Sequence, residues 1–180
     1  MFYSTHYLSP VGSLMLGCDD KDNLIGVWMQ GQKYYGGTVN EVMTEKDDLP
    51  IFKAAKNWLD NYFAGQNPSI TDLPLAPIGG EFRRAVWNVL CEIPYGEYVT
   101  YGDIAKTIAS NLGRKNMSSQ AIGGAVGHNP ISIIIPCHRV VGANGSLTGY
   151  AGGIRTKINL LEHEGADLSG LFIPTKGTAL

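Results

Sequence analysis

Cysteine is scarce in this sequence. The chain of 180 residues contains three cysteines, Cys18, Cys91 and Cys137, which are far apart and odd in number. This pattern excludes the paired framework of a disulfide-rich secreted protein. The spacings Cys-x-x-Cys and His-x-x-x-His are also missing, so we predict no structural zinc site and no bound metal. Free thiols persist in a reducing compartment, and we therefore expect a cytoplasmic protein.

Long hydrophobic runs and a strong net charge are missing as well. No window approaches the ~20 apolar residues of a membrane-spanning helix, and the N-terminus lacks the features of a signal peptide. The formal net charge of −2 argues against a general binder of polyanions. Residues 1–78 carry five lysines against nine acidic residues, whereas residues 79–165 carry eight basic against six acidic residues. The weak basic bias therefore lies in the half of the chain that contains Cys137.

The pattern of apolar residues predicts an α+β fold in two domains. Residues 1–78 are expected to form a small antiparallel sheet and one helix, with the strands and the helix at residues 2–10, 13–20, 23–30 and 49–65. Three prolines and a final glycine pair in residues 66–80 indicate a linker. Residues 79–170 are expected to be mostly helical, and residues 171–180 form a tail without a recognisable motif.

Two short helices in the second half match the helix-turn-helix pattern. Thr100 with Asp103 forms a capping-box start for the first helix, and Ser118 lies near the N-cap of the second. An ordinary helical hairpin is the commoner alternative. The second helix is built almost entirely of small residues, and each of its interior glycines costs roughly 1 kcal/mol relative to alanine. Close approach of another surface would offset that cost, either inside the protein or in the ~6 Å minor groove of DNA.

The stretch "IIIPCHRVVGANG", residues 133–145, contains the candidate nucleophile. We expect residues 133–135 to form a buried strand that Pro136 ends, and Asn144-Gly145 to form a hairpin turn. A buried cysteine is often only a small hydrophobic residue. A thiolate with a neighbouring base, oriented by an acid, is a nucleophile, and Cys137, His138 and Glu164 offer these groups. From the residues alone, acyl transfer, redox sensing and alkyl transfer all remain open.

Four segments together resemble the O6-alkylguanine-DNA alkyltransferases. These are "PCHRVVG", the preceding "HNPISIII", and the following "GSLTGYAGG" and "LLEHEG". The resemblance runs from about residue 82 to residue 165. The first 80 residues fit the ribonuclease-H-like N-terminal domain of that family only in length and general character.

The resemblance implies a role for five residues. Cys137 accepts the alkyl group, His138 removes the thiol proton through a bridging water, and Glu164 orients His138. Asn129 braces the turn between the DNA-binding helix and the cysteine, and Tyr101 donates a proton or hydrogen bond as guanine leaves. It further implies DNA contacts from Thr100, Ser118, Gln120, Ala121, Gly124 and Ala125, and a substrate pocket lined by Val126, Val140, Tyr150, Ala151 and Gly152.

The implied function is direct DNA repair without a cofactor. An alkyl group moves once and irreversibly from O6-alkylguanine, and also from O4-alkylthymine, to the protein's own cysteine. The expected partner is double-stranded DNA, entered through the minor groove with the damaged base flipped out of the stack by a monomeric protein. Two departures from the family pattern are Gln120, where relatives commonly have arginine, and Ala151, where some have serine. The alternatives are a damage sensor of the alkyltransferase-like class, against which Cys137 argues, and a Cys-His hydrolase.

Overall fold

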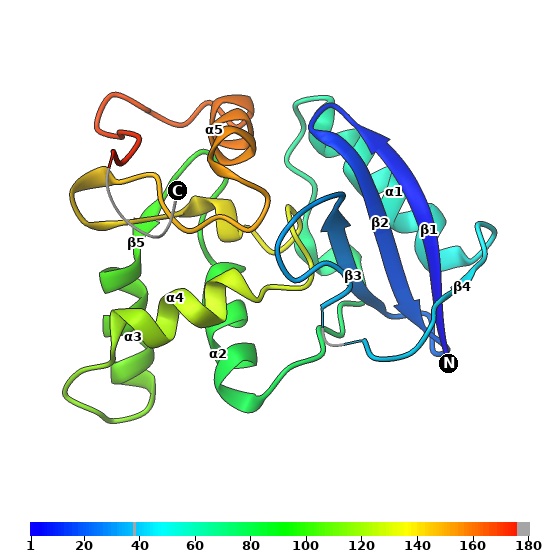
Figure 1. The fold of residues 1–180 in the computed structure, drawn as a ribbon, viewed down its shortest axis with the longest axis horizontal. Coiled ribbons are helices and arrows are strands. Elements are labelled where there is room, and N and C mark those ends of the chain that lie inside the picture. The colour runs from blue at the N-terminus through cyan, green and yellow to red at the C-terminus, as the bar shows by residue number, and fades with distance from the viewer. Residues whose placement is uncertain (38, 176–180) are drawn as a thin grey trace. The chain divides into compact units, whose positions relative to one another are not determined.

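The computed structural model describes residues 1–37 and 39–175 and divides into two compact units (Figure 1). The first unit is Met1–Gly79 with Pro130–Ile134, and the second is Gly80–Asn129 with Ile135–Leu180. The first holds a sheet and one long helix and the second holds most of the helices, which confirms the predicted α+β class. The expected boundary after residue 78 took no account of the segment 130–134. No helix in the described ranges is long and apolar enough to cross a membrane.

The sheet of the first unit has the strand order β3-β2-β1-β4. The strands are β1 Phe2–Ser9, β2 Gly12–Asp19, β3 Leu24–Met29 and β4 Thr44–Glu45. The first three are antiparallel and are the three strands that the sequence predicted. The short strand β4 pairs in parallel with β1 at the edge of the sheet. Helix α1, Pro50–Phe63, packs on β1, β2 and β3 through its apolar face. Pro50 begins this helix, where its missing N–H costs nothing.

The free edge of β3 is covered by two short segments from distant parts of the sequence. The N–H of Val27 donates to the carbonyl of Pro130 at 2.9 Å, and the N–H of Ser132 donates back to Val27 at 3.1 Å. The N–H of Leu24 likewise donates to Pro74 at 2.8 Å. The segment that leads toward Cys137 is therefore held by main-chain hydrogen bonds to the first unit's sheet.

The second unit is built on three mutually packed helices, α2 Glu81–Leu90, α3 Tyr101–Asn111 and α4 Ser119–Gly127. The predicted capping box of α3 is confirmed, because Thr100 and Asp103 each accept the other's backbone N–H. The predicted N-cap of α4 is also confirmed, since Ser118 Oγ accepts from the N–H of Ala121. Turn residues 112–118 link the two helices in the expected helix-turn-helix order.

A smaller layer of the second unit joins its two short strands, the last helix and the tail. Strands β5, Val99–Thr100, and β6, Val140–Val141, pair in parallel, and helix α5, Ile154–His163, covers them. The main chain of Phe172 exchanges hydrogen bonds with the 145–147 segment, accepting from Leu147 at 2.8 Å and donating to Gly145 at 3.0 Å. The first half of the expected tail, up to residue 175, is thus part of the fold; residues 176–180 lie outside the described residues.

Two expectations near the cysteine were wrong. Residues 133–135 are not a strand. The N–H of Ile134 bonds to the carbonyl of Ser132 at 2.9 Å, and Ile133 between them has a φ of 72°. These values match a γ-turn of the rare positive-φ form, which is a strained conformation for a β-branched residue. Burial of the isoleucines, which suggested a strand, is real, but it occurs in a turn.

The expected hairpin at Asn144-Gly145 is also not formed, although a turn is present there. A turn forms there, closed by a hydrogen bond from the N–H of Gly142 to the carbonyl of Ser146 at 2.7 Å. The flanking residues do not pair with each other, because β6 pairs with β5 and Ser146 pairs with Phe172. The turn signal was therefore correct and the strand partners were not.

Candidate active site

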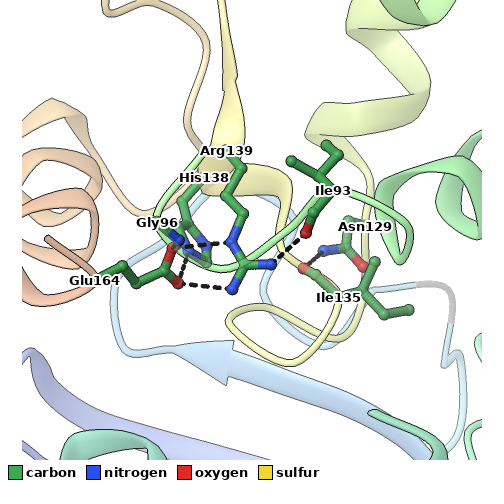
Figure 2. Close-up of polar contacts among 7 residues, drawn as sticks. All are labelled: Ile93, Gly96, Asn129, Ile135, His138, Arg139 and Glu164. Atoms are coloured by element: carbon green, nitrogen blue, oxygen red, sulfur yellow. Dashed lines mark hydrogen bonds and ion pairs between the residues drawn. The ribbon is translucent and has the colours of Figure 1, made fainter. Parts of the chain in front are cut away.

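Cys137 is presented by a tight turn centred on Pro136. The N–H of Cys137 donates to the carbonyl of Ile135 at 2.8 Å, and Pro136 has φ −82° and ψ 64°. These angles are close to those of an inverse γ-turn, about −75° and +65°. The amide of Asn129 donates to the same carbonyl of Ile135 at 2.9 Å (Figure 2). Asn129, the second residue after α4, therefore braces the turn that sets the position of the thiol.

The two residues that follow Cys137 in the chain belong to a cluster of three buried polar side chains. His138 Nε2 lies 2.7 Å from Glu164 Oε1, and neither side chain is accessible to solvent. Arg139 donates to both carboxylate oxygens, with Nε to Oε2 at 2.8 Å and Nη2 to Oε1 at 2.9 Å (Figure 2). His138 and Arg139 come from the short helix Cys137–Arg139, and Glu164 caps the end of α5. One carboxylate thus holds a histidine and a guanidinium together.

The end of α2 completes the surroundings of this cluster. Arg139 Nη1 donates to the carbonyl of Ile93 at 2.6 Å, and its guanidinium lies 5.7 Å from the ring centre of Tyr95. The N–H of Gly96 donates to Glu164 Oε2 at 3.4 Å. Gly96 has a φ of 80°, and a Cβ there would lie 3.0 Å from the carbonyl of Glu164, so this turn requires glycine.

These contacts decide the charge state of the pair. Burial would raise the pKa of Glu164, but the hydrogen bonds from His138 and Arg139 and the charge of Arg139 outweigh it and lower this pKa from 4.5 to about 2. Burial lowers the pKa of His138 in spite of the carboxylate beside it, so the imidazole is neutral at neutral pH. In a neutral imidazole, the nitrogen that faces a carboxylate carries the proton. In His138 this nitrogen is Nε2. His138 Nδ1 has no hydrogen-bond partner in residues 1–37 and 39–175, and its lone pair is thus available to accept a proton.

The thiol itself is almost completely buried, with Cys137 only 5% exposed. Burial raises the pKa of Cys137, whereas a hydrogen bond from Asn129 and the charge of Lys157 act in the opposite direction. The resting cysteine is therefore a protonated thiol. It becomes a thiolate only when a base removes the proton.

Tyr101 is hydrogen-bonded to the loop after β6. The hydroxyl of Tyr101 donates to the carbonyl of Thr148 at 3.1 Å, and a Cβ on Gly149 would lie 2.7 Å from that hydroxyl. Burial raises the pKa of Tyr101, and a thiolate at Cys137 would raise it further, so the hydroxyl stays protonated. Of the expected pocket residues, Val126, Val140 and Tyr150 are buried, whereas Ala151 and Gly152 are half-buried.

The expected DNA contacts divide by exposure. Ser118, Gln120, Ala121 and Gly124 are exposed on α4, and Thr100 is half-buried as the cap of α3. Ala125 is the exception, since its side chain is 3% exposed and its carbonyl accepts from the indole of Trp87 at 2.8 Å. Its side chain cannot form part of a contact surface, and we withdraw it from that group.

A cleft of about 580 Å³ lies between α3 and the start of α4. Its charged lining residues, Lys106, Arg114 and Lys115, are all basic. The weak basic bias of the second half of the sequence is therefore concentrated at the helix-turn-helix.

Two residues of the site had no role assigned from the sequence. Arg139 was visible only as the neighbour of His138, and nothing in the sequence indicated its bond to Glu164. Lys157 is fully buried, and its ammonium group donates to the carbonyls of Val140 and Thr148. A signal for Lys157 existed, because it lies on the apolar stripe of the last helix with Ile154, Ile158 and Leu161.

Comparison with known proteins accords with this geometry. Residues 81–166 match the family described as 6-O-methylguanine DNA methyltransferase, DNA binding domain, and residues 2–77 match its ribonuclease-like domain. The chain is 45% identical over 166 residues to the methylated-DNA–protein-cysteine methyltransferase of Methanosarcina acetivorans, covering 92% of this chain and 99% of the relative. The Haemophilus influenzae protein of the same name is 39% identical, covering 90% and 86%.

Solved structures agree. The crystal structure of Mycobacterium tuberculosis OGT in complex with DNA aligns with a TM-score of 0.75 at 38% identity, covering 94% of each chain. A second crystal structure, described as the O6-methylguanine methyltransferase of the same organism, aligns with a TM-score of 0.74 at 38% identity, covering 98% of this chain and 97% of the other. This chain therefore belongs to the 6-O-methylguanine DNA methyltransferase family.

Proposed function

We propose that this protein repairs alkylated double-stranded DNA by transferring the alkyl group of O6-alkylguanine, and of O4-alkylthymine, to the sulfur of Cys137. The observation that carries the proposal is the buried thiol next to a neutral histidine whose Nε2–H faces the carboxylate of Glu164. Family membership and a relative whose structure contains DNA support the substrate class. Only residues of the second unit take part in the chemistry described here.

The reaction needs one proton transfer and one substitution at carbon. His138 Nδ1 takes the thiol proton through a bridging water, and the sulfur attacks the alkyl carbon in line with the bond to O6. The carbon–sulfur bond forms as the carbon–oxygen bond breaks, and the electron pair stays on guanine. The hydroxyl of Tyr101, which its raised pKa keeps protonated, donates a hydrogen bond to the departing guanine, and the proton that guanine finally gains balances the one that His138 took from the thiol. Water does not cleave the thioether product, so each chain acts once.

The alkyl carbon lies on a base edge inside the duplex, so the nucleotide has to leave the stack. We assign the DNA-facing surface to the exposed side of α4, which would enter the minor groove. A Cβ at Gly123, Gly124 or Gly127 would meet nothing within 4 Å. Internal packing therefore does not explain why this helix keeps glycines that lower its stability. Approach of an external surface remains as the explanation.

Charge at the helix-turn-helix supports the same assignment. The cleft with Lys106, Arg114 and Lys115 adjoins the start of α4, where DNA phosphates flank the minor groove. The basic cleft would then bind the DNA backbone, and the neighbouring helix α4 of the same motif would enter the groove. We further propose a monomer that works in the cytoplasm, where Cys137 stays reduced.

Replacing the nucleophile gives the first prediction. Cys137→Ser is expected to abolish alkyl transfer and to leave DNA affinity unchanged, because the proposed DNA surface is on other residues. Intact-mass measurement after incubation with duplex containing O6-methylguanine should show one added methyl group on the wild-type chain and none on the variant. Methylation at Cys18 or Cys91 with Cys137 unmodified would contradict the assignment.

A second prediction concerns the carboxylate. Glu164→Gln should lower the transfer rate at pH 7 by about 10²-fold, the lower end of what a positioned base contributes. It should also destabilise the fold by about 3 kcal/mol, because Arg139 and its charge remain buried without a counter-charge. Glu162→Gln on the same helix changes an exposed carboxylate and is the matched control.

The same variant has a defined pH dependence. The folded chain binds the Glu164 proton with a pKa of about 2 and the unfolded chain with the ordinary value of 4.5. The contribution of this carboxylate to the free energy of unfolding is therefore fully present above pH 4.5 and is lost as the pH falls toward 2. Denaturant unfolding at several pH values should show a gap between wild type and Glu164→Gln that narrows over this range. A gap independent of pH would mean that the charge is not what stabilises the cluster.

Gln120 gives a third prediction. Its exposed position near the start of α4 fits a residue that fills the space left by a flipped base. Gln120→Ala should slow transfer from duplex DNA about tenfold, since unstacking a base costs a few kcal/mol, and should leave the reaction with free O6-benzylguanine unchanged. Gln120→Arg should preserve or raise the duplex rate. Single-turnover rates on both substrates test this; equal slowing on the free base would place Gln120 outside the flipping step.

A fourth prediction separates folding from binding at α4. Gly124→Ala should stabilise the free protein by up to about 1 kcal/mol, because the site is exposed, helical and open. The same methyl group should weaken binding to duplex DNA several-fold by obstructing entry into the groove. Thermal unfolding and fluorescence-anisotropy titration measure the two effects, and the free-base reaction is the control. A variant that is more stable and binds DNA equally well would remove α4 from the contact surface.

A further inference from the structure

Lys157 is a buried cation in the second unit that the mechanism above does not use. Its side chain is completely inaccessible, and its ammonium group donates to the carbonyl of Val140 and, at 2.9 Å, to that of Thr148. None of the ion pairs within residues 1–37 and 39–175 includes it. Burying a cation without a carboxylate is costly, which indicates a function other than simple packing.

Both carbonyls that bind Lys157 belong to the surroundings of the thiol. Val140 follows Cys137 by three residues, and the carbonyl of Thr148 also accepts the hydroxyl of Tyr101 at 3.1 Å. Lys157 therefore ties the strand after the cysteine to the loop that holds Tyr101. These two hydrogen bonds fix the ammonium group in place, whereas that of a surface lysine is mobile.

The charges around Cys137 leave Lys157 without compensation. Glu164 and Arg139 form a close pair whose charges cancel, His138 is neutral and Tyr101 is protonated. Burial lowers the pKa of Lys157 from 10.5 to about 8, so it is still mostly charged at pH 7. The charge of Lys157 lowers the pKa of Cys137. It also lowers the pKa of His138, but it has the smallest effect of the groups that act on that histidine. Before the proton moves, the net charge near the thiol is thus the charge of Lys157, and this charge is still present when His138 has taken the proton and the thiolate has formed.

We propose that Lys157 is a positioning residue of the alkyl-transfer site, whose ammonium group, fixed by two backbone carbonyls, supplies the positive charge that stabilises the Cys137 thiolate. The thiol proton still goes to His138, and Lys157 neither gives nor takes a proton in the reaction. This role rests on the proposed function. It adds a second interaction that favours the thiolate and that does not depend on the His138–Glu164 hydrogen bond.

The test replaces the charge and keeps the shape. Lys157→Met removes the charge and the donors, whereas Lys157→Gln removes the charge and retains an amide donor for the carbonyls. Arg155→Met, which removes an exposed cation two residues away on α5, is the matched control. The rate of carboxamidomethylation of Cys137 by iodoacetamide, followed by peptide mass spectrometry across pH, reports the thiol pKa without any reference to DNA repair. The rate with free O6-benzylguanine across pH is measured alongside.

Both Lys157 variants are expected to shift the pH profile of Cys137 upward by about one unit, which slows both reactions about tenfold at pH 7 and restores them at higher pH. Arg155→Met should leave the profile unchanged. A uniform slowing with an unshifted profile, or failure of both Lys157 variants to fold, would make Lys157 purely structural and overturn the proposal. If the wild-type chain reacts with iodoacetamide but not with O6-benzylguanine, the proposed function fails, whereas an unshifted profile with normal transfer refutes only the role of Lys157.

Discussion

A single buried carboxylate, that of Glu164, organises the active site. It accepts hydrogen bonds from His138 and from two nitrogens of Arg139, and its low pKa is the result of those contacts. A buried charge of this kind is stable only when its partners are in place, so the end of α5 and the cysteine loop must form together. The same contacts select one tautomer of His138 and leave its other nitrogen to accept a proton. In the mechanism that we propose, structural integrity and reactivity therefore depend on one interaction.

The second constraint is the turn that positions the thiol. Ile135 offers one carbonyl to both Cys137 and Asn129, and Pro136 restricts the backbone between them. Asn129 is the second residue after α4, the helix that we propose enters the DNA groove. The thiol and the DNA-facing helix are thus joined through one side chain and a few residues of main chain. This short connection lets binding of DNA and presentation of the nucleophile share one rigid frame.

How much of this was predictable depends on the range of the interactions involved. The caps at Thr100 and Ser118 are local, and the sequence predicts both correctly. The turn before Cys137 is set by Pro136 and by a hydrogen bond from Asn129, and three successive isoleucines were wrongly interpreted as a strand. Arg139 and Lys157 were visible as charges next to apolar residues, but their partners come from segments that only the fold brings together. The proposed roles of Cys137, His138 and Glu164 came from a dense set of family motifs, not from spacing alone.

The protonation state of His138 is the central claim, and nitrogen-15 NMR of histidine-labelled protein measures it directly. At neutral pH the account predicts a neutral His138 ring with its proton on Nε2, bonded to Glu164, and a bare Nδ1. The signal should keep that form well below the pH at which an exposed histidine takes up a proton, because burial lowers the pKa of His138. An imidazolium at neutral pH, or a neutral ring with the proton on Nδ1, would contradict the account, since neither leaves Nδ1 free to take the proton of Cys137.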